Sequence, residues 1–163
     1  MENIMKRPAN GFSLIELLIV VAIILIIAAI AIPNLLRARI QANEASAVSS
    51  IHAVNTAEIS YSAVFPTVGF SDSLVALGDG GASPCPGSAA ASCYLDSNLA
   101  GGTKSGYIFK YVGDTTVPAL HYTLNADPSN RGVSGQRSFY SSGANVTRYN
   151  ATSVASSSDS PLQ

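Results

Sequence analysis

The chain has 163 residues, of which 47% are hydrophobic and 12% are charged, about half the charged fraction usual in globular domains. The formal net charge of −1 gives no electrostatic footprint for nucleic acid, which we therefore do not expect as a partner. Once the most apolar segment is set aside, the remainder is long enough for one small domain rather than two.

An unbroken apolar run follows a short polar N-terminus. Residues 12–32 include only Ser13 and Glu16 as polar side chains. A helix of that length extends about 31 Å, close to the roughly 30 Å hydrocarbon core of a bilayer. Lys6 and Arg7 precede the run and predict a cytoplasmic N-terminus, with the rest of the chain exported. The sequence therefore predicts a transmembrane anchor over residues 12–32.

Glu16 is an unusual residue for an anchor. An ionised side chain at the centre of a span costs about 2.5–3.5 kcal/mol on insertion scales, and less near an end. Two interpretations follow from this position. Either Glu16 extends to the lipid headgroups and has no further role, or it is neutralised by a cation within an assembly.

The N-terminal residues together resemble those of a type IV prepilin. The resemblance lies in Lys6 and Arg7, the segment GFSLIEL over residues 11–17, the apolar run and Pro33. A secretory signal peptide differs, because its cleavage site follows its apolar core. Here the expected cleavage site precedes the run, so the run stays in the mature protein.

The resemblance implies a processing event and an assembly contact. A prepilin peptidase is expected to cleave between Gly11 and Phe12, to remove residues 1–11 as a leader peptide, and to methylate the new amine of Phe12. During growth of a helical homo-oligomeric filament at an inner-membrane assembly platform, Glu16 is expected to pair with the Phe12 amine of a neighbouring subunit.

The helical pattern continues beyond the anchor. Pro33 lacks an amide hydrogen and predicts a kink or local opening of the helix near residues 29–33. Residues 34–62 contain neither Gly nor Pro. We expect one helix over residues 12–62, roughly 76 Å long, whose second half is the spine for a small sheet.

The spine is recognised by apolar side chains at helical spacing, namely Ile40, Ala47, Ile51, Val54 and Tyr61. Glu44 and Glu58 lie close to this stripe and make the pattern imperfect.

Residues 63–106 are rich in Gly and Pro, which predicts loops with short helical turns over 71–77 and 95–100 that cover one edge of the sheet. Cys85 and Cys93 are the only cysteines, and in an exported domain we expect them to be joined. A pair of free thiols or a metal pair is the alternative, but no His or further Cys lies nearby in the sequence.

Alternating apolar residues predict strands over 107–112 and 120–124, and shorter ones over 137–141 and 145–149 with a turn at 142–144. We expect an α+β fold in which an antiparallel sheet of three or four strands, within residues 107–150, packs on the helix. Residues 151–163 are rich in Ser and are expected to form a flexible tail.

The sequence offers no constellation for catalysis, so we expect no enzyme, cofactor or metal site. His52 and His121 are far apart in the sequence and are interpreted as partly exposed polar residues. Asp114, Asp127 and Asp159 are scattered singly and do not predict a calcium site. No nucleophile motif, phosphate-binding loop or zinc-ligand spacing occurs.

The resemblance extends more weakly to residues 104–107, 122–128 and 135–140, which look like sheet segments of some major pilins and pseudopilins. The leading hypothesis is a structural subunit of a type IV pilus serving adhesion or motility, anchored in the inner membrane before assembly and extracellular afterwards. The alternatives are a pseudopilin of a type II secretion system and a membrane-anchored enzyme or binding module.

Overall fold

The computed structural model describes residues 13–81 and 84–162. Contacts divide the chain into two units, Met1–Arg37 and Ala38–Gln163, which we describe separately. We call the second unit the head. The expected leader peptide, Gly11 and Phe12 lie outside the described residues.

Helix α1 spans Leu14–Val64, which confirms the predicted long helix to within two residues at each end. Pro33 lies inside α1, where its missing amide leaves the carbonyl of Ala29 without its usual helical partner. The predicted kink at Pro33 stays a prediction.

Within the head, α1 buries one face. Ile51 and Val54 are fully inaccessible, and Ala47 and Tyr61 are nearly so. Glu44 and Glu58 are buried on the same face, so the two acids that made the stripe imperfect belong to it.

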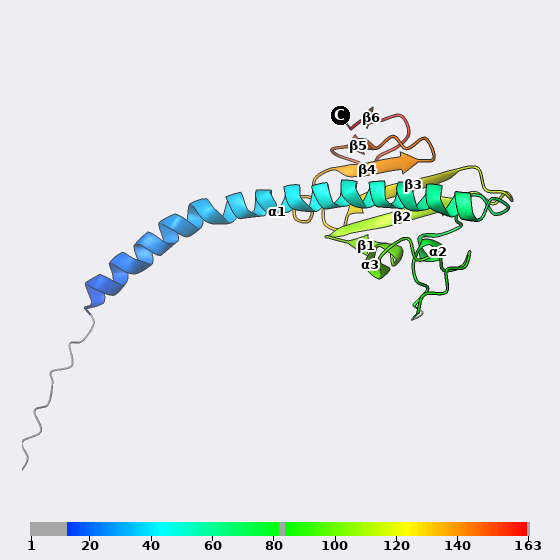
Figure 1. The fold of residues 1–163 in the computed structure, drawn as a ribbon. Coiled ribbons are helices and arrows are strands. Elements are labelled where there is room, and N and C mark those ends of the chain that lie inside the picture. Colours follow the sequence, from blue (N-terminus) through cyan, green and yellow to red (C-terminus); the bar gives the residue numbers. More distant parts are fainter. Residues whose placement is uncertain (1–12, 82–83, 163) are drawn as a thin grey trace, which may run out of the picture. The chain divides into compact units, whose positions relative to one another are not determined.

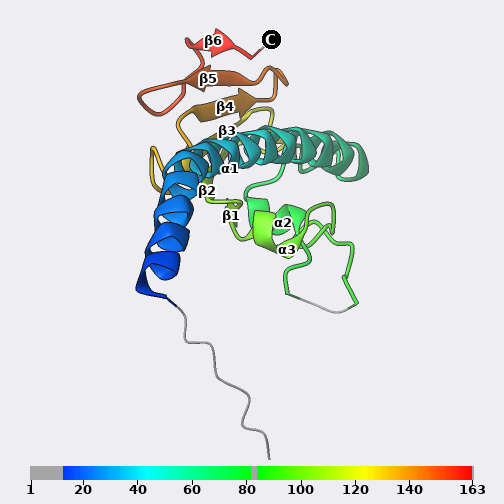
Figure 2. The ribbon, with the colours of Figure 1, turned by 90° about the vertical axis from the view of Figure 1, so that its left-hand side faces the viewer.

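A six-stranded antiparallel sheet follows, with its strands in chain order from edge to edge. The prediction of three or four strands was therefore too low. Figures 1 and 2 show α1 crossing one face of the sheet over its middle strands. The strands are β1 Thr103–Lys104, β2 Tyr107–Gly113, β3 Tyr122–Pro128, β4 Ser138–Ser142, β5 Arg148–Asn150 and β6 Ser160–Pro161.

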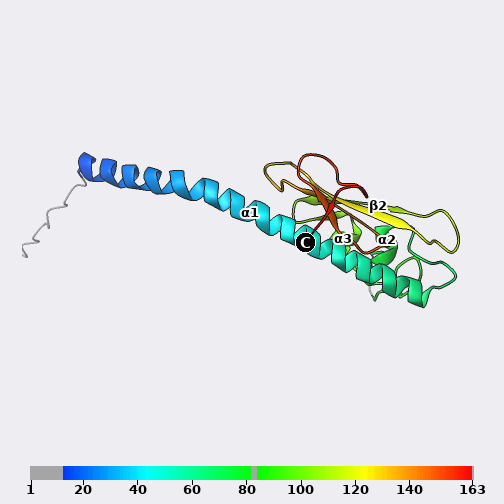
Figure 3. The ribbon, with the colours of Figure 1, turned by 90° about the horizontal axis from the view of Figure 1, so that it is seen from above.

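The core lies between this face of the sheet and α1, which run alongside each other in Figure 3. Alternation along β2 and β3 directs Phe109, Leu124 and Ala126 toward the helix, and β4 adds Phe139. Ala126 is fully buried and, with Ala47 on the helix, provides small side chains in the core.

Two strand positions differ from their predictions. The second strand was expected over 120–124, but Leu120 is 64% exposed and β3 begins at Tyr122. Gly113 pairs with Tyr122 as the last pair of the β2–β3 hairpin, which leaves 114–121 as its connection. β3 then continues to Pro128 because pairing with β2 stabilises residues of low strand propensity. β5 likewise begins at Arg148 rather than at residue 145.

The segment before the sheet contains the two expected helical turns, α2 Leu74–Leu77 and α3 Ser97–Ala100. Ser73 and Asp96 are their N-caps, and each accepts a hydrogen bond from the third residue after it. Leu77 and Leu99 are buried in the core cluster, so these turns extend the core beyond the β1 edge.

The C-terminal segment, expected to be a flexible tail, lies on the sheet in the residues described. β6 pairs with β5, and Ala155 is buried. The side chain of Asn125 donates to the Ala155 carbonyl at 2.6 Å. Asp159 accepts from the Ser156 amide and hydroxyl and from Asn150, so polar contacts hold a segment whose composition predicts no order.

Candidate assembly site on the N-terminal helix

Glu16 lies in the first turn of α1. Its Oε2 atom accepts a hydrogen bond from the backbone amide of Ser13 at 2.9 Å. Ser13 directly precedes the helix, so Glu16 is the third helical residue and supplies the acceptor half of a capping box. The carboxylate thus caps its own helix, at the end where the helix dipole favours negative charge.

The described residues contain no Lys or Arg within ion-pair distance of Glu16. The expected partner of Glu16, the Phe12 amine, lies outside the described residues, as does the Gly11–Phe12 bond. Cleavage, methylation and pairing therefore stay predictions.

The surface around Glu16 is almost entirely apolar. In α1, an 18-residue window has a mean hydropathy of 3.3, none of it is buried within the chain, and by length and composition the helix could cross a membrane. Large side chains such as Leu14, Ile24 and Leu35 are each more than half exposed. An uninterrupted apolar surface of this extent requires lipid or other protein around it.

Two buried carboxylates in the head are contacts that the sequence analysis did not predict. Glu44 accepts hydrogen bonds from the amides of Gln136 at 2.9 Å and Arg137 at 3.0 Å, and from Arg137 Nε at 2.8 Å. Burial raises the pKa of Glu44, but the hydrogen bonds from Arg137 and Gln136 outweigh it and leave the pKa below its usual value. Glu44 thereby ties α1 to the start of β4.

Glu58 is fully buried near the other end of the same stripe. It accepts from the Ser71 amide at 2.9 Å, and from the Ser71 and Tyr111 hydroxyls at 2.5 Å each. Burial, followed by the hydrogen bond to Glu58, raises the pKa of Tyr111 far above its ordinary value. The helical spacing of Glu44 and Glu58 within the apolar stripe was the signal that could have marked both as buried.

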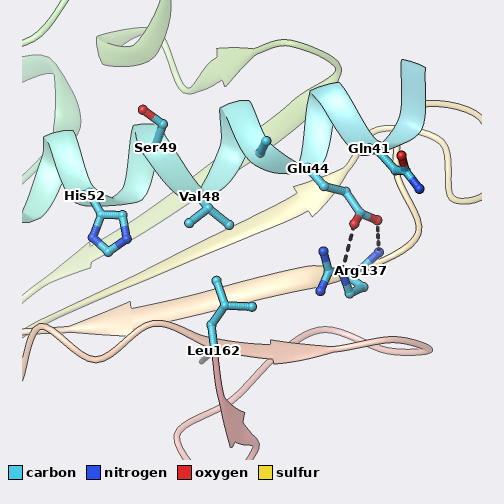
Figure 4. Close-up of a pocket in the computed structure, with 8 residues that line it drawn as sticks. Gln41, Glu44, Val48, Ser49, His52, Arg137 and Leu162 are labelled. Atoms are coloured by element: carbon cyan, nitrogen blue, oxygen red, sulfur yellow. Dashed lines mark hydrogen bonds and ion pairs between the residues drawn. The ribbon is translucent and has the colours of Figure 1, made fainter. Parts of the chain in front are cut away.

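A groove of about 480 Å³ runs along α1 beside Leu162 of the C-terminal segment (Figure 4). Glu44 and Arg137 are joined at one end of it, and His52 lies at the other. Eight residues, or about 12 Å of helix, separate Glu44 from His52. Acid and imidazole therefore do not form a catalytic pair in this groove.

The remaining candidate residues are dispersed. His52 and His121 are both exposed, as expected. Asp114, Asp127 and Asp159 belong to separate segments, and no group of three His, Cys, Asp or Glu side chains that could hold a metal occurs in residues 13–81 and 84–162.

Cys85 and Cys93 are joined in a disulfide, as the sequence predicts. The Cys93 end is held by backbone hydrogen bonds, such as that from the Cys93 amide to the Gly78 carbonyl at 2.9 Å. Residues 84–88, around Cys85, are exposed. The disulfide therefore tethers the exposed Cys85 end of this loop to the better-held Cys93 end.

Reduction of the disulfide should destabilise the head. Closing a loop with a sequence separation of 8 is worth about 2–3 kcal/mol on the chain-entropy model. We expect the melting temperature of the full chain in detergent to fall by roughly 5–10 °C on reduction. A variant with both cysteines replaced by Ser should not respond to reductant. Identical melting of oxidised and reduced chains would show that the loop adds nothing to stability.

The comparisons with known proteins each cover about a third of the chain or less. Residues 6–32 match the family model described as the prokaryotic N-terminal methylation motif. The type IV wide pilus major component PilA4 of Thermus thermophilus is 68% identical over 38 residues, which are 23% of this chain and 29% of that protein. The type IV major pilin protein PilA of Myxococcus xanthus is 49% identical over 56 residues, 34% of this chain and 26% of that protein.

The matches thus span less than a third of either relative. No solved structure matches the chain. Both relatives are pilus components rather than enzymes, which agrees with the expected lack of an activity. A helix packed on an antiparallel sheet and headed by a methylation motif defines the class of pilin-like proteins. Within that class, the motif and both relatives make this chain similar to type IV pilins.

Proposed function

We propose that the chain is a major structural subunit of a type IV pilus. The observation that carries this proposal is the exposed apolar part of α1, with an acid in its first turn and a folded head after it. Before assembly, the bilayer covers this surface. In the filament, the same surface of other copies replaces the lipid, which makes the subunit a homo-oligomer outside the cell.

The motif match over residues 6–32 supports processing by a prepilin peptidase at Gly11–Phe12. Cleavage creates a positively charged amine about 6 Å along the helix axis from Glu16. A neighbouring subunit that is displaced outward by this distance brings its Phe12 amine level with the Glu16 carboxylate. Attraction in a low-dielectric setting then fixes the register of successive subunits as they leave the assembly platform.

The experiment that tests this function is deletion of the gene followed by complementation. Electron microscopy should show surface filaments with the intact gene and none in the deletion strain. Mass spectrometry of sheared filaments should find the mature chain beginning at N-methylated Phe12. Filaments that still carry residues 1–11 would contradict the processing step.

The same strains test the alternative function, that of a pseudopilin in a type II secretion system. If the deletion leaves surface filaments unchanged and abolishes the secretion of exported proteins, the chain is a pseudopilin. Both relatives are named as major components or major pilins of type IV pili, which favours the pilus.

A further inference from the structure

Most basic side chains of the head have a polar partner within the head. Lys104 and Arg137 form ion pairs with Asp96 and Glu44. Lys110 lies 3.9 Å from Asp127, and Arg131 and Arg148 donate to carbonyl oxygens. In residues 13–81 and 84–162, the basic side chains left without a hydrogen bond or an ion pair are Arg37 and Arg39, and both are exposed.

A groove of about 770 Å³ at the opposite end of the head carries the complementary charge. Figure 1 shows the segment after α1 and the β2–β3 connection at this end, beyond the C-terminal end of the helix. Asp72 and Asp114 line the groove. Its apolar wall includes Val68, Phe70, Val75, Val117 and Ala119.

The two carboxylates come from segments in close contact. A Cβ atom on Gly113 would lie 3.1 Å from the Asp72 Cα atom, so the end of β2 packs directly on the Asp72 backbone. Asp72 accepts from the Ser73 hydroxyl at 2.9 Å and Asp114 from the Thr116 amide at 3.2 Å, and neither contacts a cation among the described residues. Hydrogen bonds from Thr116 lower the pKa of Asp114, so this carboxylate is charged at neutral pH.

Arg39 cannot reach this groove in its own subunit. Arg39 and Tyr61, which lines the groove, are separated along α1 by a helical distance of about 33 Å. That distance is roughly four Debye lengths at physiological ionic strength. Arg39 can therefore interact with the acids of this groove only when the groove belongs to another copy of the chain. A contact between different surfaces of identical subunits can repeat without closing, as a filament requires.

We propose that the Asp72–Asp114 groove receives Arg39 of a second copy of this chain. The inference rests on the proposed function as a filament subunit. The aliphatic stem of Arg39 packs on the apolar wall, and its planar guanidinium binds the carboxylates that line the groove. Arg37 lies two residues earlier, about 200° around the helix, and so faces away from the same groove.

Charge exchange tests the contact in cells that express the full chain as their only copy. We expect Arg39→Asp and Asp114→Arg each to lower the number of surface filaments about tenfold, equivalent to about 1.4 kcal/mol. The combined variant should return the count to within about twofold of the original, because the pair is restored with reversed sign. Subunit in the membrane fraction, measured by immunoblot, should be unchanged.

The matched control is Asp79→Arg, which makes the same charge change at an acid that does not line the groove and should leave filaments unchanged. If Asp114→Arg fails to accumulate, Asp72→Arg tests the same groove from the other segment, and the neutral Asp114→Asn should weaken assembly in the same direction.

Normal filament counts in both single variants would overturn the contact. Loss of filaments in Arg39→Asp without rescue by either groove variant would also overturn it, and would assign Arg39 to lipid headgroups instead. Absence of filaments from the original chain would contradict the proposed function itself, so the two failures are distinguishable.

Discussion

Replacing Glu16 with Gln is expected to abolish filaments while export, processing and folding of the head continue. The substitution keeps an oxygen that can accept from the Ser13 amide, so the start of α1 is preserved. It removes the negative charge on which the proposed contact with the Phe12 amine of a neighbour depends. Breaking a buried ion pair from one side costs about 3–5 kcal/mol, because the other charge stays unpaired. For each subunit added to the filament, this free energy corresponds to an equilibrium constant of addition lowered by more than about a hundredfold.

The measurement compares filament number by electron microscopy with the amount of processed subunit in the membrane fraction. Asp79→Asn is the matched control, since it removes one negative charge in the head and should leave assembly unchanged. A normal filament yield from Glu16→Gln would show that charge pairing does not drive assembly. In that case Glu16 would serve only to cap its own helix.

Replacing Glu58 with Ala should destabilise the head more than any other single change at a polar position. The variant leaves the Ser71 amide without its buried acceptor, and the Tyr111 hydroxyl keeps only the Ser71 carbonyl. It also opens a cavity beneath α1, where Glu58 is fully inaccessible. An unpaired buried donor costs about 1–3 kcal/mol and the cavity adds to this cost, so we expect a loss of about 3–5 kcal/mol in the free energy of unfolding.

Chemical unfolding of the full chain in detergent, followed by near-ultraviolet circular dichroism, measures this change. Tyr111→Phe should cost less, about 1–2 kcal/mol, since the Ser71 donors remain paired with Glu58. The double variant should be less destabilised than the sum of the two, because both changes remove the same hydrogen bond. Tyr94→Phe, at an exposed tyrosine, is the control. A Glu58→Ala variant as stable as the original would show that the buried carboxylate contributes nothing net.

The sequence by itself determined the long helix and predicts a membrane anchor in its first part. An apolar run of 21 residues and a periodic stripe without Gly or Pro are local patterns, and local patterns predict helices well. The class of fold followed from alternation in the segments that became β2 and β3. The disulfide followed from there being two cysteines in a chain that we expect to be exported.

Only the tertiary structure decided how the polar residues are used. Glu44 and Glu58 meet partners 93 and 53 positions away in sequence, Arg137 and Tyr111, which no local pattern links to them. The edge strands β1 and β6 have two residues each, too few for alternation to be visible, and form because a neighbouring strand offers unpaired hydrogen-bonding groups. Likewise, Asp72 and Asp114 share a groove only because the end of β2 packs on the loop after α1. Each of these contacts depends on which distant segments the sheet and helix bring together, and that information resides in the packing of the whole head.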